Sequence, residues 1–179
     1  MSNPTMRLFI AINFSRETKD KLTTLQSTLR DRSKQGSFTA PENLHLTLSF
    51  LGDCNPSQAD AIKSAMDATS FEPFDMKINH IGYFKRDGGD TWWAGMDESK
   101  PLFDLHRKLT QNLSAVGFKP EKRKYTPHIT LARRVVTDMQ PWPIDPFGET
   151  AYKIQLMKSE HIGGKLTYTS IYMLTVKPL

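Results

Sequence analysis

The segment from Leu44 to Gly52 alternates apolar and polar residues, a pattern that predicts a β-strand with one buried face. The apolar side chains of this strand share one face, and they are Leu44, Leu46, Leu48 and Phe50. The opposite face carries His45, Thr47 and Ser49, so an imidazole and a hydroxyl lie one pleat apart. This pair makes the polar face of the strand a candidate functional site.

The same arrangement returns in the second half of the chain. His128, Ile129, Thr130 and Leu131 repeat the pattern His-x-Thr-Leu, again with the histidine and the threonine on one face. A single copy is ordinary, because a surface histidine beside a β-favouring threonine needs no special explanation. Two copies, each with an apolar opposite face, indicate that the two strands act together.

Apolar periodicity and capping residues predict the other elements. Helical spacing predicts three amphipathic helices: one over about 15–33, one that starts at Asn55 with a capping box to Gln58, and one from Ser99 to just before Gly117. Apolar runs rich in β-branched and aromatic residues predict strands at 7–14, 75–84, around 92–96, 149–160 and 166–176. The proline-rich segment 141–146 is predicted to be a loop.

The order of these elements repeats once along the chain. In each half an amphipathic helix is followed by a glycine–phenylalanine segment, at 36–38 or 117–118, and then by a His-x-Thr-Leu strand. Two α+β lobes facing each other would bring the two polar faces together across a cleft. No linker divides the chain, so we predict a single bilobal domain that spans residues 1–179.

The composition limits the kinds of partner and of site. The chain has 179 residues, and its net charge of +5 favours an anionic partner such as RNA, a nucleotide or a phosphoester. Cys54 is the only cysteine, which excludes an intrachain disulfide framework and fits a reducing compartment. The apolar run 8–12 is too short for a signal peptide or a membrane span. We therefore expect a cytoplasmic protein with no membrane partner.

Two facing imidazoles suit acid–base catalysis at a phosphate. Because the pKa of histidine is ordinarily near neutrality, one ring can accept a proton while the other, already protonated, donates one. Such a pair supports in-line displacement at phosphorus, and each proton transfer is typically worth about 10²–10⁴-fold in rate. The hydroxyls of Thr47 and Thr130 can donate to non-bridging phosphate oxygens.

Other residues near the second motif extend this hypothesis. Arg133 and Arg134 offer guanidinium groups to a phosphate, but strict alternation places Arg133 on the face opposite His128. Its use therefore requires the strand to end or bulge. The basic residues Lys119, Lys122, Arg123 and Lys124 form either a solvated loop or a surface that attracts a polyanion. Aromatic residues that could stack on a base, or pack in the core, are Tyr125, Phe14, Trp92 and Trp93.

A metal site is the main structural alternative for the histidines. No His-Glu-x-x-His or comparable spacing of ligands occurs, so we expect no metal and no other cofactor. The remaining histidines are expected to be structural or solvated, and they are His80, His106 and His161.

Three stretches of the chain resemble the two-histidine (2H) phosphoesterase superfamily. They are the opening strand 7–11, the segment 42–52 around the first motif, and the segment 125–133 around the second. Within the superfamily, the chain is similar to the RNA 2′,3′-cyclic phosphodiesterases, first named 2′-5′ RNA ligases. The four His and Thr positions show no departure from the family pattern.

The resemblance implies a bilobal α+β fold, with two pseudo-symmetric lobes of antiparallel sheets flanked by helices around a central cleft. It implies metal-independent hydrolysis of a terminal RNA 2′,3′-cyclic phosphate to a 2′-phosphomonoester. By the same resemblance His45 is the proton donor and His128 the proton acceptor. Thr47 and Thr130 hold the phosphate, and Arg133 matches a phosphate-contacting arginine.

Several alternatives to RNA 2′,3′-cyclic phosphate hydrolysis stay open on the sequence. The same phosphoryl transfer with a ribose hydroxyl in place of water would ligate 2′-5′ RNA ends. The substrate could be another small cyclic phosphate, or the chain could bind RNA without turnover. We expect a monomer that needs no protein partner.

Overall fold

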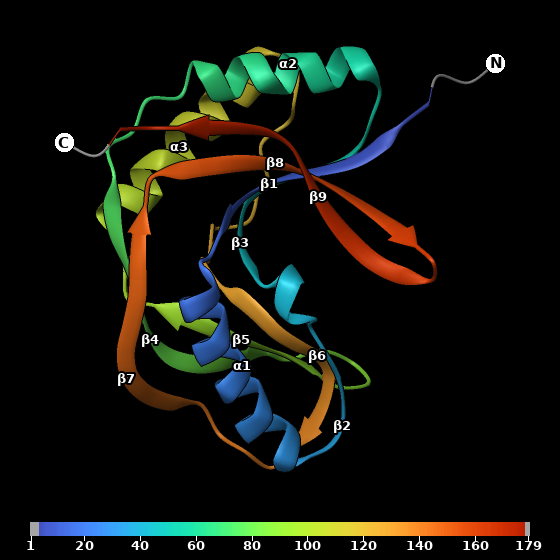
Figure 1. Ribbon diagram of the computed structural model, residues 1–179, viewed down its shortest axis with the longest axis vertical. Helices are drawn as coiled ribbons and strands as arrows, with labels where there is room; N and C mark the ends of the chain where they lie inside the picture. The colour runs from blue at the N-terminus through green and yellow to red at the C-terminus, as the bar shows by residue number, and fades with distance from the viewer. Residues whose placement is uncertain (1–3, 178–179) are drawn as a thin grey trace.

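Residues 4–177, which the computed structural model describes, form two antiparallel sheets (Figure 1). The first sheet has the strand order β3-β1-β8-β9, with β3 His45–Cys54, β1 Met6–Asn13, β8 Lys153–Ile162 and β9 Lys165–Thr175. The second sheet has the order β2-β6-β5-β4-β7, with β2 Ser33–Phe38, β6 Ile129–Thr137, β5 Asp90–Met96, β4 Phe74–Phe84 and β7 Trp142–Ala151. The predicted α+β class is confirmed.

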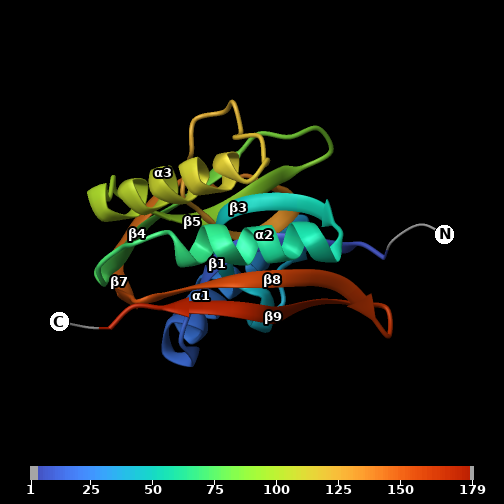
Figure 2. The same ribbon diagram turned by 90° about the horizontal axis from the view of Figure 1, so that it is seen from above.

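Three α-helices cover the sheets within the described residues: α1 Arg16–Asp31, α2 Pro56–Asp67 and α3 Lys100–Ala115. The predicted capping box of α2 is confirmed, because Asn55 and Gln58 exchange hydrogen bonds at 2.8 Å. Helix α1 packs on the second sheet, whereas α2 and α3 lie together on the first (Figures 1 and 2). A short 3₁₀ turn, η1 Pro41–Asn43, leads directly into β3.

The chain crosses repeatedly from one sheet to the other. It passes from β1 in the first sheet to β2 in the second, and then returns to the first for β3. It crosses again to the second sheet for β4 to β7, with α3 between β5 and β6 packed on the first sheet, and finally returns to the first for β8 and β9. Each sheet therefore contains strands from both halves of the sequence, and one continuous cluster of buried side chains extends over both.

Two predictions about the last part of the chain are wrong. The segment 141–146, predicted to be a loop, lies mostly in strand β7, and the predicted strand 149–160 is divided at Tyr152 between β7 and β8. Strand β7 tolerates Pro143 and Pro146 because it is the edge strand of its sheet and pairs only with β4. At Tyr152 the chain leaves the second sheet for the first.

Each motif strand carries an extra residue directly after its threonine. In β3, Thr47 lies opposite Ala11 and Ser49 lies opposite Ile10, which leaves Leu48 without a partner on β1. In β6, the same shift leaves Leu131 unpaired, because its neighbours on either side face consecutive residues of β5. The two motif strands therefore bulge at equivalent positions, and the alternation of faces moves by one residue beyond each bulge.

The bulge in β3 overturns the predicted orientation of Phe50. Strict alternation assigns Phe50 to the buried face with Leu48, but its side chain is 48% exposed. A second irregularity in the register follows, because Phe50 lies opposite Phe9 while Gly52 lies opposite Leu8. The guanidinium of Arg7 instead covers the ring of Phe50, with 4.9 Å between the guanidinium carbon and the ring centroid.

Gln26 stabilises the backbone around the bulge in β6. This buried side chain of α1 donates from Nε2 to the carbonyl of Thr39 at 2.8 Å and to that of Leu131 at 2.9 Å. We predict that Gln26→Met lowers the free energy of unfolding by about 1–3 kcal/mol, because the Thr39 carbonyl loses its partner. Urea denaturation measures this change. The matched substitution Gln111→Met, on the exposed face of α3, should change it by less than about 0.5 kcal/mol.

Candidate active site

Both motif histidines are oriented by main-chain carbonyls. Nδ1 of His45 lies 2.7 Å from the carbonyl oxygen of Asn43, and Nδ1 of His128 lies 2.8 Å from that of Thr126. In each case the carbonyl belongs to the residue two positions earlier. A carbonyl only accepts hydrogen bonds, so Nδ1 carries the proton and donates it. Nε2 of each neutral ring is therefore left as the atom that can take up or release a proton.

The two histidines influence each other's protonation. Burial lowers the pKa of His45, and the positive charge of a protonated His128 lowers it further. Burial likewise lowers the pKa of His128, and the charge of Arg133 adds to this effect. The mutual repulsion disfavours two protons on the pair, so the singly protonated state supplies one acid and one base.

The two threonines occupy the same face as the histidines, one pleat further along. The Oγ1 of Thr47 lies 2.9 Å from Nε2 of His45, so the first motif forms a hydrogen-bonded pair. Thr130 is half-buried and lies opposite Trp93 of β5. The structure thus gives His45 a hydrogen-bonded hydroxyl, and Thr130 follows His128 by two residues at the start of β6.

Arg133 reaches the cleft because β6 bulges. The unpaired Leu131 shifts the alternation by one residue, so Arg133 follows the face of His128 and Thr130. Arg133 lines the cavity together with Thr47 and His128, and its charge lowers the pKa of both histidines. Arg134 does not line the cavity; it has a positive φ of 55° within a second irregularity of the strand.

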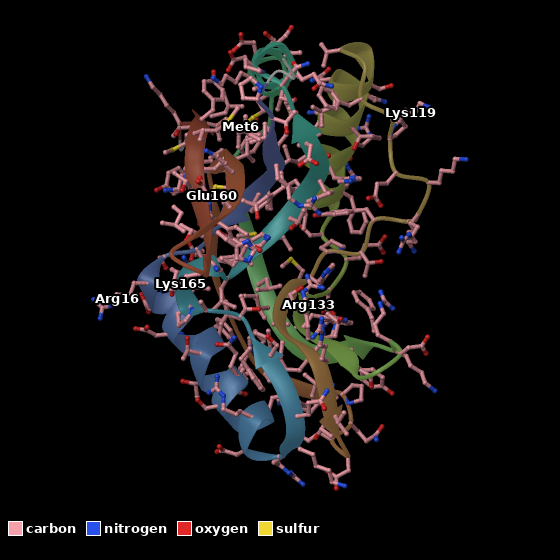
Figure 3. The ribbon with its side chains drawn as sticks, turned by 90° about the vertical axis from the view of Figure 1, so that its right-hand side faces the viewer. Met6, Arg16, Lys119, Arg133, Glu160 and Lys165 are labelled. Carbon is pink, nitrogen blue, oxygen red and sulfur yellow. The ribbon has the colours of Figure 1, made fainter. Side chains whose placement is uncertain are left out.

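A cavity of about 600 Å³ lies beside His128. Its walls are the open edge of β3, the C-terminal half of α3 and the segment 118–126. The cations that line it are Arg86, Lys119, Arg123, Lys124 and Arg133. Figure 3 looks onto this side of the molecule, with Arg133 between the loop of Lys119 and the β8–β9 hairpin at Lys165. The cavity is therefore suited to an anionic ligand of nucleotide size.

Two residues near the histidines had no signal in the sequence. Arg86 sits in the turn between β4 and β5, where its guanidinium lies 5.4 Å from the centroid of the Phe84 ring. Phe84 in turn packs its edge against His128, with 5.0 Å between the ring centroids. Tyr168 of β9 packs edge-on against His45 at 5.3 Å. Arg86 in its turn and Tyr168 in its strand are far from the histidines in sequence, so only the tertiary structure identifies them.

The candidate aromatic residues have different surroundings. Phe14 and Trp92 are buried in the core, and Trp93 lies between His80 and His128. Tyr125 stacks in parallel on His106, with 3.7 Å between the ring centroids. That face of Tyr125 is therefore occupied. His106, expected from the sequence to be structural or solvated, lines the cavity.

Among residues 4–177, no group of three or more His, Cys, Asp and Glu side chains is placed to hold a metal ion. None of the helices in that range combines the length and the apolar character needed to cross a membrane.

The chain is similar to known proteins of one family. A family model described as LigT like Phosphoesterase matches residues 12–93 and 95–161. The chain is 33% identical over 131 residues to the RNA 2′,3′-cyclic phosphodiesterase of Methanothermobacter thermautotrophicus, covering 72% of this chain and 71% of that protein. It is also 33% identical over 131 residues to the RNA 2′,3′-cyclic phosphodiesterase of Thermotoga maritima, covering 72% of this chain and 70% of that protein.

Solved structures share the fold. The crystal structure of Escherichia coli LigT complexed with 3′-AMP superposes with a TM-score of 0.85 at 22% identity, covering 97% of this chain and 99% of that one. A crystal structure described as a phosphoesterase gives a TM-score of 0.86 at 24% identity, with the same coverage. The predicted bilobal two-histidine phosphoesterase fold is confirmed.

The interaction between the histidines leads to a testable prediction. His128→Asn should raise the pKa of His45, because the nearby positive charge is removed while the burial of His45 is retained. Titration of the imidazole Cε1–H signal by NMR measures the change. His161→Asn, an exposed position on β8, serves as the control and should leave the titration of His45 unchanged. A His45 pKa that does not respond to His128→Asn would show that the rings are not coupled.

Proposed function

The chain belongs to the LigT-like phosphoesterase family, and from this premise we propose that it hydrolyses RNA 2′,3′-cyclic phosphate ends to 2′-phosphomonoesters. The observation that carries the proposal is the pair of backbone-oriented histidines, His45 and His128, each beside a motif threonine. The names of the curated relatives supply the cyclic RNA end as substrate.

In the proposed reaction His128 acts as base and His45 as acid, as the family resemblance assigns them. Nε2 of His128 takes a proton from a water molecule, whose oxygen attacks phosphorus. The bond between phosphorus and the 3′-oxygen breaks, and protonated His45 donates its Nε2 proton to that oxygen. The product keeps the 2′-phosphate and gains a free 3′-hydroxyl. Exchange of protons with solvent returns the pair to its starting state.

Thr47 couples the protonation of His45 to phosphate binding. When His45 is neutral, its Nε2 accepts the hydrogen bond from the Thr47 hydroxyl. When His45 is protonated, Nε2–H donates to the same oxygen, which frees the hydroxyl proton for a phosphate oxygen. Thr130 and Arg133 complete the proposed phosphate site, and Arg133 supplies a permanent positive charge.

The basic cavity supports an RNA strand as substrate. A mononucleotide needs few cations, whereas the cavity and the segment 118–126 present several beside one another. We further propose that residues 1–179 act as one catalytic domain and as a monomer. Cys54 is a buried free thiol, consistent with action in the reducing cytoplasm.

Product analysis tests the reaction. With an RNA that ends in a 2′,3′-cyclic phosphate, and with EDTA present, chromatography should show conversion to the 2′-phosphate. His45→Ala and His128→Ala should each lower kcat by about 10²–10⁴-fold, because each removes one proton transfer. His161→Ala is the matched control. Formation of the 3′-phosphate, or full activity of either motif variant, would contradict the mechanism.

The basic segment gives a separate prediction about the substrate. The triple variant Lys119→Gln, Arg123→Gln, Lys124→Gln should raise KM for a cyclic-ended oligonucleotide by about tenfold or more at low salt, because phosphate contacts are lost. Its KM for a nucleoside 2′,3′-cyclic phosphate should change much less. Added salt should shrink the difference between variant and wild type. Lys63→Gln on α2 is the control. Equal effects on both substrates would exclude a strand-binding role.

A further inference from the structure

The carbonyl of each motif threonine accepts a hydrogen bond from the segment that leads to the other motif. The hydroxyl of Tyr125, just before the second motif, donates to the carbonyl of Thr47 at 2.9 Å. The hydroxyl of Thr39, just before the first motif, donates to the carbonyl of Thr130 at 3.0 Å. The two hydrogen bonds form a reciprocal pair, which we call the hydroxyl latch.

Both carbonyls lie where the sheets leave them without a strand partner. Strand β3 is the edge of its sheet, so the side of Thr47 that faces away from β1 has no neighbouring strand. The strand β2 that borders β6 ends at Phe38, opposite Ala132, before it reaches Thr130. A carbonyl in such a place needs a side chain or water as its donor. In both cases the hydroxyl comes from the segment that leads to the other motif. Tyr125 lies beside α3 on the first sheet with Thr47. Thr39 continues from β2 on the second sheet with Thr130, where its own N–H donates to the carbonyl of Leu131 at 3.0 Å.

Each latch hydroxyl is itself held by a helix. Tyr125 stacks on His106 of α3 and meets the edge of Phe103, with 5.8 Å between those ring centroids. Burial raises the pKa of Tyr125 well above its ordinary value, so the phenol stays protonated and remains a donor. Thr39 is fixed from α1, because Gln26 donates to its carbonyl. Tyr125 and Thr39 are therefore each held by a helix as well as by the hydrogen bond to a motif strand.

The distance between the two motif strands must be set by contacts other than strand pairing. Strands β3 and β6 belong to different sheets, so no ladder of main-chain hydrogen bonds sets the distance between them. Acid–base catalysis by two groups on one phosphate depends on that distance, and an error of about 1 Å can cost about 10²-fold in rate.

We propose that Thr39 and Tyr125 are paired positioning residues, whose reciprocal hydrogen bonds set the separation of the motif strands and hence that of His45 and His128. The expected effect of this positioning on the reaction rate rests on the proposed hydrolysis. Neither residue needs to touch the substrate. The latch acts through the main chain of Thr47 and Thr130, beside the bulge in each strand.

Kinetics of hydroxyl-deleted variants test the rate effect. Tyr125→Phe keeps the stacked ring and Thr39→Val keeps the shape, so both should fold. Each should lower kcat by about tenfold, and the double variant by about 10²-fold, with little change in KM. Thr39→Ser, which restores a hydroxyl, should recover most of the activity. Tyr152→Phe and Thr28→Val remove exposed hydroxyls and should leave kcat unchanged.

A second measurement separates positioning from general stability and from the proposed function. The rise in the pKa of His45 on His128→Asn reports how close the two rings are, and NMR measures it without turnover. In the latch double variant this rise should be smaller than in the wild type. An unchanged rise would overturn the positioning role, even if kcat falls. If instead the wild type proves inactive on cyclic RNA ends while the rise still shrinks, the latch stands and the assigned reaction fails.

Discussion

The hydrogen bond from Nδ1 of each histidine to a main-chain carbonyl two residues earlier is the constraint on which the site depends. It fixes the tautomer and the direction of the ring without another side chain. In each case the accepting carbonyl belongs to the segment that leads into the motif strand: the end of the η1 turn before His45, and the irregular segment 124–128 before His128. The fold must therefore bring two strand beginnings, each with its leading segment, to one cleft.

The crossing of the chain between the sheets meets this requirement. The leader of the first motif leaves β2 in the second sheet, passes Thr39 and enters β3 in the first. The leader of the second motif leaves α3 beside the first sheet, passes Tyr125 and enters β6 in the second. Each leader thus contacts the strand of the other motif before it reaches its own. This connectivity places the donors of the two reciprocal hydrogen bonds. Together they link the two motif strands near the histidines.

The sequence predicts the two His-x-Thr strands well because their signal is local. His45 and Thr47 share a strand face by alternation alone, and the second copy identifies them as a site. Alternation fails at Phe50 and gives the wrong face for Arg133, since a bulge depends on hydrogen bonds to a neighbouring strand. The strand through Pro143 was missed for a similar reason, because only the sheet order shows that it is an edge.

Residues that approach the site from other elements carry no local signal at all. Strand β2, with the sequence Ser-Lys-Gln-Gly-Ser-Phe, has no apolar alternation and forms because β6 offers it an edge. Arg86 lies in a polar turn, and Tyr168 lies in a strand of mixed polarity. Their places beside His128 and His45 follow from the packing of the lobes. The resemblance to a family singles out Arg133, which the periodicity alone placed on the face opposite His128.

The cations of the cleft attract anions, and Arg133 among them also lowers the pKa values of both histidines. Burial and the charge of Arg133 lower the pKa of both histidines, and the charge of a protonated His128 lowers that of His45 further. Under the proposed function, a phosphate bound between the rings adds a negative charge that opposes these effects and favours one imidazolium. The substrate then completes the acid–base pair when it binds. The same cations that depress the histidine pKa values attract the anion that raises them, so the acid forms where a phosphate is present to receive its proton.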